Sequence, residues 1–298
     1  MIPTPLEEVE LAGRRLLLKR EDSHELGAFK WRGALPTLEA YKRRGADTII
    51  TASTGNHGAA TAWAAERLGM RAVVFASEHT SRTKLGQIEQ LGAEIRLAGA
   101  DFDEAKEEAE RFAADAGVLF VDGMEQEQYE GYSAIADEIL DQAPETPAAI
   151  VVPVGNGALL AGIGMGICRR NPEVERVGVV AKAAPVMALS WEAGEAVESD
   201  ESATFADGLA VRVAIPEAVD ALGEFASRML QVSERDIAFA VGAYAGAGIR
   251  AEGAAAAALA AVAQLDDLGD PLVLIVTGMN IDDELFTRAR RQPESFPD

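Results

Sequence analysis

The chain has 298 residues, one cysteine and a formal net charge of −22, and 21 of its 27 basic residues are arginine. A surface this acidic argues against a nucleic-acid or anionic-membrane partner and suggests selection for solubility in high salt, although an ordinary acidic enzyme is the alternative. A single Cys168 excludes an intrachain disulfide and does not argue against a reducing cytoplasm, and the first residues, MIPTPLEEVE, lack the features of a signal peptide.

Short apolar runs alternate with helical stretches along the chain. Runs that predict strands are 14–20, 48–53, 71–77, 93–99, 118–123, 148–155, 174–181 and 271–278. Stretches that predict helices are 31–44, 58–69, 80–91, 103–116, 129–142, 158–170, 234–247 and 251–268. Strands separated by helices of this length imply parallel sheets with right-handed crossovers, and therefore an α/β fold.

One uncharged stretch, 147–168, is long enough to cross a bilayer. Its β-rich first part, AAIVVPV, is followed by GNGALLAGIGMG, where glycine recurs every two to four residues. This punctuation favours a buried strand that turns into a helix, so we expect no membrane span.

Two segments interrupt the regular pattern. The Pro-rich DQAPETPAA at 141–149 is a plausible domain boundary, and the acidic 191–203 lacks periodicity and is expected to be a surface loop. We therefore expect two α/β lobes with open parallel sheets: a small lobe at 40–142, inserted into a large lobe made of 1–39 and 143–298.

In open parallel sheets, ligands bind beyond the carboxyl ends of the strands, often where a Gly-rich turn opens a helix. Four turns qualify: 25–32, 53–58, 154–162 and 277–280. The turn VGNGALLAG at 154–162 has the glycines and the helix start that favour an anion, but it lacks the Lys-Ser/Thr pair of a P-loop. A tight structural turn explains it as well as a phosphate site does.

The turn at 53–58 concentrates polar side chains between a strand and a helix. Ser53, Thr54, Asn56 and His57 all lie in it, and they suit a carboxylate or a cofactor oxygen. A helix cap by Ser53 or Thr54 is the simpler alternative, but a cap needs only one such residue.

Lysine occurs only six times, so a lysine in an apolar setting is informative. Lys30 lies between Phe29 and Trp31 in GAFKWRGA, where desolvation would favour a neutral amine nucleophile. The alternative is an amphipathic lysine at the start of a helix, with its ammonium group in water.

Taken in order, these motifs resemble the fold type II (tryptophan synthase β-like) enzymes that depend on pyridoxal 5'-phosphate (PLP). Within that group the chain is most similar to threonine/serine dehydratases, serine racemases and threonine synthases. The resemblance covers most of the chain with its order intact. Its motifs are TPL (4–6), LLLKRED (16–22), GAFKWRGA (27–34), TASTGNHGAA (51–60), KLGQIEQLGAEI (84–95), VPVGNGALLAG (152–162), TFADGLAV (204–211), IRAEGAAAAAL (249–259) and VTGMN (276–280).

The resemblance implies how the cofactor is held. Lys30 would carry PLP as a Schiff base and later remove the Cα proton of the substrate. Phe29 and Gly208 would pack on the two faces of the ring, and Thr277 would meet the pyridine nitrogen as a neutral partner that keeps the ring unprotonated more often than an Asp partner would. The residues that would wrap the phosphate are Gly155, Asn156, Gly157, Ala158 and Leu159.

The resemblance also implies a substrate loop. Ser53, Thr54, Gly55, Asn56 and His57 would bind the substrate carboxylate, with Asn56 also bonded to the ring hydroxyl. Thr54 is a candidate catalytic residue, because racemases place a serine at this position as the acid on the second face of Cα.

Departures from the family pattern leave the reaction open. The phosphate loop reads Gly-Asn-Gly-Ala instead of four glycines, which, like STGN at 53–56, is reminiscent of threonine synthases, whereas His57 resembles dehydratases and racemases. We expect β-elimination from a small hydroxy-amino acid such as L-threonine or L-serine. The alternatives are γ-replacement on O-phosphohomoserine, amino-acid racemisation, and a PLP-binding carrier or sensor without catalysis; a nucleotide-binding module would not need Lys30.

The remaining expectations concern other ligands and assembly. The region where some relatives bind a cation reads VVAKAAPVMALSWEAG at 179–194, so we expect no metal site. A homodimer is implied by the family resemblance alone.

Overall fold

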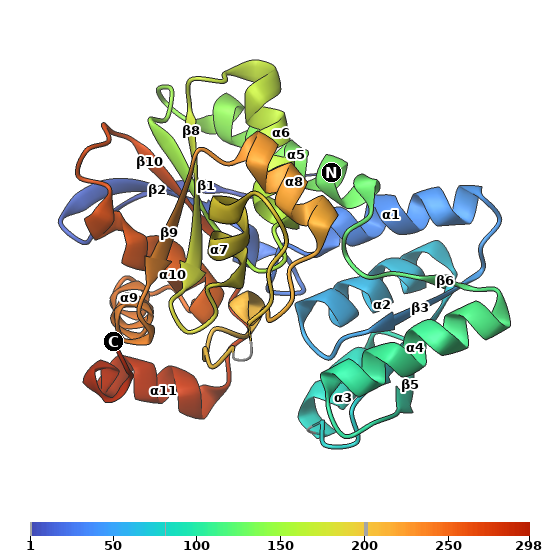
Figure 1. Ribbon diagram of the computed structural model, residues 1–298. Coiled ribbons are helices and arrows are strands. Elements are labelled where there is room, and N and C mark those ends of the chain that lie inside the picture. The colour runs from blue at the N-terminus through green and yellow to red at the C-terminus, as the bar shows by residue number, and fades with distance from the viewer. Residues whose placement is uncertain (1, 81, 200–201) are drawn as a thin grey trace. The chain divides into compact units, whose positions relative to one another are not determined.

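The computed structural model describes residues 2–80, 82–199 and 202–298, and the chain forms two compact units (Figure 1). The large unit consists of residues 1–29 and 132–298, and the small unit of residues 30–131. Sequence reasoning places the boundaries later, at 39/40 and 142/143. In the structure α1 (Trp31–Arg43) packs against α2 (Asn56–Leu68), and α1 therefore counts with the small unit.

The large unit is built on a six-stranded sheet in the order β1-β2-β10-β7-β8-β9. Its strands are β1 (Leu6–Leu11), β2 (Arg14–Arg20), β7 (Ala149–Pro153), β8 (Glu175–Ala181), β9 (Arg228–Val232) and β10 (Leu272–Val276). All neighbours are parallel except β1 and β2, which form an antiparallel hairpin. The central β7 and β10 are buried at every residue, as expected for parallel strands covered on both faces.

Helices cover both faces of this sheet. Both α6 (Ala158–Arg170) and α10 (Gly253–Ala260) contact β7 and β8. Val177 and Val179 of β8 belong to the apolar cluster that contains α10, whereas a Cβ on Gly178 would lie 2.7 Å from Leu160 of α6. Because side chains of a strand alternate between faces, α6 and α10 lie on opposite sides of the sheet.

The prediction of an α/β fold with open parallel sheets is confirmed, with local corrections. The predicted helix 251–268 is too long, since α10 ends at Ala260 and a 3-10 turn, Ala261–Gln264, follows. The predicted loop 191–203 begins inside α7; its residues 200 and 201 lie outside the described residues. Elements that sequence reasoning did not identify are β1, β9, α7 (Val186–Ala193), α8 (Pro216–Phe225) and α11 (Asp283–Arg291), while α9 (Glu234–Gly246) was expected.

The small unit has a four-stranded, wholly parallel sheet in the order β5-β4-β3-β6. Its strands are β3 (Thr48–Ala52), β4 (Arg71–Ala76), β5 (Glu94–Leu97) and β6 (Leu119–Phe120). Its helices are α1, α2, α3 (Arg82–Gln90), α4 (Phe102–Ala116) and the start of α5 (Gln126–Gln142). Ala109 and Ala113 of α4 pack on Ile50 and Val73, which gives this unit its own apolar core.

The uncharged stretch 147–168 forms β7 and the first turns of α6, as the glycine pattern indicates. Among the described residues, no helix has the length and apolar character that a membrane crossing requires.

Candidate active site

In the large unit, Phe29 is fixed by a short pairing with the chain that leaves β10. The Phe29 N–H donates to the Thr277 carbonyl at 2.9 Å, and the Met279 N–H donates to the Gly27 carbonyl at 2.8 Å. Ala28 and Gly278 form the antiparallel bridge between these two bonds. Phe29 and Thr277, both predicted to contact the cofactor, therefore lie side by side at the carboxyl end of β10.

The predicted phosphate loop follows β7 and opens α6. A Cβ on Gly155 would lie only 2.3 Å from the carbonyl oxygen of Gly208, so the two backbones touch. Gly157 has a φ of 97°, a conformation that suits glycine, and as N-cap of α6 it offers no side chain to the free N–H groups. Within this loop the Asn156 side chain accepts from the Ala158 N–H at 3.3 Å.

These residues share one edge of the large sheet. β7 and β10 are parallel neighbours, so the loop 155–157 and Thr277 both follow the carboxyl ends of adjacent strands. The N-cap of α6 is a glycine without a capping side chain, and beyond the Ala158 N–H, which bonds to Asn156, the helix start suits an anion. At Gly155 the contact with Gly208 leaves no room for a side chain. The large unit therefore fits a phosphate group beside an aromatic residue and a hydroxyl.

We expect Gly155→Ala to weaken PLP binding by about 10²-fold, because the new Cβ pushes the phosphate loop away from Gly208 and a strained loop costs a few kcal/mol. Fluorescence titration of the apoprotein with PLP measures this. Gly223→Ala is the control, since a Cβ at Gly223 meets nothing within 4 Å. Equal PLP affinity for the two variants would contradict the tight-loop assignment.

In the small unit, Lys30 lies at the N-terminal end of α1. Its carbonyl accepts from the N–H groups of Gly33 and Ala34, which starts the helix there. Lys30 is half-buried, and the neighbouring Trp31 is only 5% exposed. The Lys30 side chain is therefore partly withdrawn from water. Lys42 on the same helix is exposed and donates to the Leu68 carbonyl.

The predicted substrate loop connects β3 to α2. A Cβ on Gly58 would lie 2.0 Å from the Ser53 carbonyl oxygen, so the loop folds back tightly on the first turn of the helix. The N-cap residue, Gly55, has no capping side chain; its own N–H donates to Ser53 Oγ at 3.3 Å. The simple cap by Ser53 or Thr54 is thus not found, and α2 presents an uncapped N-terminus next to half-buried polar residues.

His57 in this loop is held in its neutral form. Burial, and secondly the charge of Lys30, lower the pKa of His57 to about 4. Its Nε2 lies 3.3 Å from the Val121 carbonyl oxygen, which can only accept. The proton of the neutral ring is therefore on Nε2, and Nδ1 is a hydrogen-bond acceptor.

We expect His57 to make the protein less stable in acid. In the unfolded chain the pKa of histidine is about 6.5. The stability that a neutral His57 contributes is complete above that pH and is lost as the pH falls towards the folded pKa of about 4.

Urea unfolding at pH 7 and at about pH 5 measures this loss. Between pH 7 and about pH 5, the free energy of unfolding of His57→Gln should fall by about 2 kcal/mol less than that of the wild type. His79→Gln, at an exposed position, should behave as the wild type. Parallel losses in all three proteins would contradict the burial of a neutral His57.

The structure thus forms two groups of the predicted residues, one in each unit. The large unit brings together Phe29, Gly155, Asn156, Gly157, Ala158, Leu159, Gly208 and Thr277. The small unit contains Lys30, Ser53, Thr54, Gly55, Asn56 and His57. Sequence reasoning missed Glu252, whose carboxylate accepts from Thr277 Oγ1 at 2.9 Å. Glu252 lies in the motif IRAEGAAAAAL, but it is 25 positions from Thr277, so no local sequence pattern predicts their contact.

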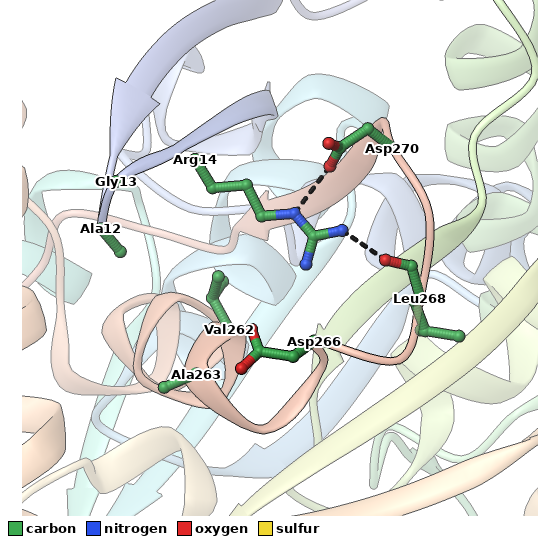
Figure 2. Close-up of a pocket in the computed structure, with 8 residues that line it drawn as sticks. All are labelled: Ala12, Gly13, Arg14, Val262, Ala263, Asp266, Leu268 and Asp270. Atoms are coloured by element: carbon green, nitrogen blue, oxygen red, sulfur yellow. Dashed lines mark hydrogen bonds and ion pairs between the residues drawn. The ribbon is translucent and has the colours of Figure 1, made fainter.

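A hollow of about 370 Å³ lies at the opposite end of the large sheet (Figure 2). Arg14 at the start of β2 reaches across it to Asp270, with Nε 2.6 Å from Oδ1, and its Nη2 donates to the Leu268 carbonyl at 2.7 Å. Arg14 in this hollow is held by Asp270 and by the carbonyl groups of Leu265, Leu268 and Gly269, so its role there is to fix the 265–270 turn. Because β10 carries Thr277 at its other end, the hollow is no part of the candidate site.

No group of three or more His, Cys, Asp or Glu side chains that suits a metal ion occurs among the residues with described positions.

Comparison with known proteins places the chain in a family. The family model described as "Pyridoxal-phosphate dependent enzyme" matches residues 1–278. The L-threonine ammonia-lyase of Thermotoga maritima is 33% identical over 286 residues, which are 94% of this chain and 70% of that relative. The enzyme of the same name from Geobacter sulfurreducens is 34% identical over 278 residues, 92% of this chain and 69% of that one.

A solved structure agrees with these relatives. The processed form of threonine deaminase isoform 2 from Solanum lycopersicum matches with a TM-score of 0.90 at 28% identity, covering 97% of this chain and 87% of that chain. The chain therefore belongs to the PLP-dependent enzymes of fold type II, as its motifs indicate. Its cofactor is PLP.

Proposed function

We propose that the chain is a PLP-dependent ammonia-lyase that acts on a small hydroxy-amino acid such as L-threonine or L-serine. With L-threonine, the proton on Cα and the hydroxyl on Cβ are lost as water. One water is then consumed when hydrolysis releases the nitrogen as ammonia. The net products are 2-oxobutanoate and ammonia.

The observation that carries this proposal is the similarity to L-threonine ammonia-lyases. It extends over 94% of the chain in the first relative, so it includes both groups of candidate residues. The uncapped start of α6 and the glycine backbone contact at Gly155 independently suit the cofactor phosphate.

We assign the cofactor-holding roles as follows. Residues 155–159 would bind the phosphate, Phe29 and Gly208 would pack on the ring, Thr277 would meet the pyridine nitrogen, and Asn56 would meet the ring hydroxyl. PLP supplies the electron sink that makes a Cα proton acidic. The fixed backbone around Phe29 and Thr277 keeps the ring-binding groups in place before a substrate arrives.

We assign the reacting groups to the small unit. Lys30 would hold the cofactor covalently, and its amine would take the Cα proton of the substrate. The loop 53–57 binds the substrate carboxylate at the start of α2, where free N–H groups favour an anion. Thr54 supplies a hydroxyl in this loop, and neutral His57 adds an acceptor without adding charge.

Three other functions remain to be separated from this one: γ-replacement on O-phosphohomoserine, racemisation, and a PLP carrier or sensor. The GNGA phosphate loop favours the first, and a hydroxyl at Thr54 the second. The holoenzyme should be incubated in turn with L-threonine, L-serine and O-phosphohomoserine, and 2-oxo acid, phosphate and D-amino acid measured.

Release of 2-oxo acid from L-threonine or L-serine, with no phosphate from O-phosphohomoserine, is the expected result. Phosphate release with threonine formation would establish the γ-replacement instead. Formation of D-amino acid without 2-oxo acid would establish a racemase. The absence of every product would favour a PLP carrier or sensor without catalysis.

We also propose that the enzyme works in the cytoplasm as a homodimer. The single, half-buried Cys168 suits a reducing compartment, and the family resemblance suggests the dimer. Light scattering of the holoenzyme measures the assembly, and a monomer mass would contradict it.

A further inference from the structure

The 293–298 segment packs back onto the large unit beside α9 and α11 (Figure 1). The Arg235 N–H donates to the Pro297 carbonyl at 2.9 Å, and Arg235 Nε donates to the Phe296 carbonyl at 3.2 Å. The guanidinium carbon of Arg288 lies over the Phe296 ring, 4.2 Å from its centroid. Phe296 is only 4% exposed, so its ring is a buried part of the large unit.

The Phe296 ring meets the loop that leads to Gly208. The centroids of the Phe296 and Phe205 rings are 4.7 Å apart, and the rings are inclined at 53°. Phe205 lies three positions before Gly208, the residue assigned to one face of the cofactor ring. Aromatic pairs at this separation stabilise beyond the apolar area that they bury. The 293–298 segment therefore supports the loop 204–208 through an aromatic contact.

Helices α9 and α10 hold the same loop at other points. The Phe205 N–H donates to Oε2 of Glu234, the buried first residue of α9, at 2.8 Å. A Cβ on Gly253, the first residue of α10, would lie 2.9 Å from Ala206, so only glycine permits this close approach. The loop 204–208 is thus fixed at its backbone by two helices and at the Phe205 ring by Phe296.

The far end of the loop 204–208 contacts the predicted phosphate loop. A Cβ on Gly155 would lie 2.3 Å from the Gly208 carbonyl oxygen, so these two backbones touch. Because protein interiors are close-packed, a shift of the loop at Phe205 is passed on to its neighbours. A displaced Phe205 ring would therefore disturb both Gly208 and the backbone at Gly155.

We propose that Phe296 is a positioning residue for the cofactor: by packing on Phe205 it fixes the loop 204–208, and with it the place of Gly208 beside the PLP ring. The inference rests on the proposed function in one respect, namely that Gly208 packs on this ring. It gives a role in cofactor binding to a segment that lies beyond residues 1–278, the part of the chain that the family model matches.

Fluorescence titration of the apoprotein with PLP, without any substrate, tests the proposal. In Phe296→Ala the Phe205 ring loses its partner, and we expect PLP affinity to fall by about tenfold, in line with the loss of one aromatic contact. Phe296→Leu keeps an apolar side chain against Phe205, so its affinity should fall by only about threefold.

Asp298→Ala is the matched control within the same segment. It removes an exposed ion pair with Arg235 and leaves the Phe296 ring in place. Its PLP affinity should equal that of the wild type. The visible circular dichroism of bound PLP, which reports the asymmetry of its surroundings, should decrease in Phe296→Ala and stay unchanged in Asp298→Ala.

A second background shows whether Phe296 acts through Phe205. In Phe205→Ala the aromatic pair is already broken, so adding Phe296→Ala should change PLP affinity by less than about twofold. Urea unfolding of the apoproteins measures the stability of each variant separately from its affinity. If Phe296→Ala does not fold, the titration of Phe296→Leu, with its threefold weaker binding, carries the test.

Two results would overturn the inference. One is an unchanged PLP affinity in the Phe296 variants that fold, which would show that the contact with Phe205 serves stability alone. The other is the same loss of affinity on replacing Phe296 with and without the Phe205 ring. Failure of the proposed lyase function is distinct, because no substrate enters the titration and the differences in PLP affinity would persist without activity.

Discussion

Lys30→Ala is expected to abolish covalent attachment of PLP and to lower kcat by about 10⁴-fold, the upper end of what a positioned base contributes. Lys30 is half-buried at the start of α1, beside Trp31 and close enough to His57 for its charge to lower the pKa of that ring. Removing its amine takes away both the proposed attachment point and the proposed base. Steady-state kinetics with L-threonine and the visible spectrum of the holoenzyme measure the two effects.

Lys42→Ala is the matched control for this experiment, because it removes an exposed amine from the same helix. It should keep the cofactor spectrum and change kcat by less than about twofold, which corresponds to under 0.5 kcal/mol. A Lys30→Ala enzyme that retains the spectrum and the activity of the Lys42→Ala enzyme would contradict the assignment.

Lys19→Met is expected to have the largest effect on stability, a loss of about 3–5 kcal/mol, because it breaks a buried ion pair and leaves a carboxylate without its cation. Lys19 is 0% exposed, and its Nζ donates to Glu138 at 2.6 Å, to Gln142 at 2.9 Å and to the Thr4 carbonyl at 2.8 Å. The network joins the start of the chain, β2 and α5. Urea unfolding of the purified variants measures the loss.

Arg15→Met on the same strand is the control. The ion pair of Arg15 with Glu145 is 2.8 Å long but exposed on both sides, so its loss should cost under about 1 kcal/mol. The double variant Lys19→Met/Glu138→Leu should recover much of the lost stability, since it removes the carboxylate of the pair as well as its cation. Equal unfolding midpoints for Lys19→Met and Arg15→Met would show that the buried pair contributes nothing.

The parts of the fold that sequence reasoning identified are those with local signatures. The strand that becomes β7 and the helix that becomes α6 are separated by glycines, and the predicted helix 158–170 has the bounds of α6. The tight turn before α2 also has a local signature in the sequence. Position 58 lies so close to the Ser53 carbonyl that only glycine fits there. Loop geometry of this kind depends on residues a few positions apart.

The features that were missed depend on distant partners. β1 pairs antiparallel with β2 although half of its residues, LEEVEL, are glutamate, a composition that an edge strand tolerates. Glu252 meets Thr277 only after α10 has packed beside β10, 25 positions along the chain. Lys19 and Lys30 look alike in the sequence as lysines next to apolar residues, and only the position of Glu138 shows that Lys19 is structural.

The central claim is that Lys30 carries the cofactor, and reduction of the holoenzyme with borohydride tests it most directly. Reduction converts the lysine–PLP linkage into a stable secondary amine that survives proteolysis, so mass spectrometry can locate it. The expected result is a single modified peptide that contains Lys30 between Phe29 and Trp31. A modified peptide that contains any other lysine, or none at all from PLP-saturated enzyme, would contradict the account.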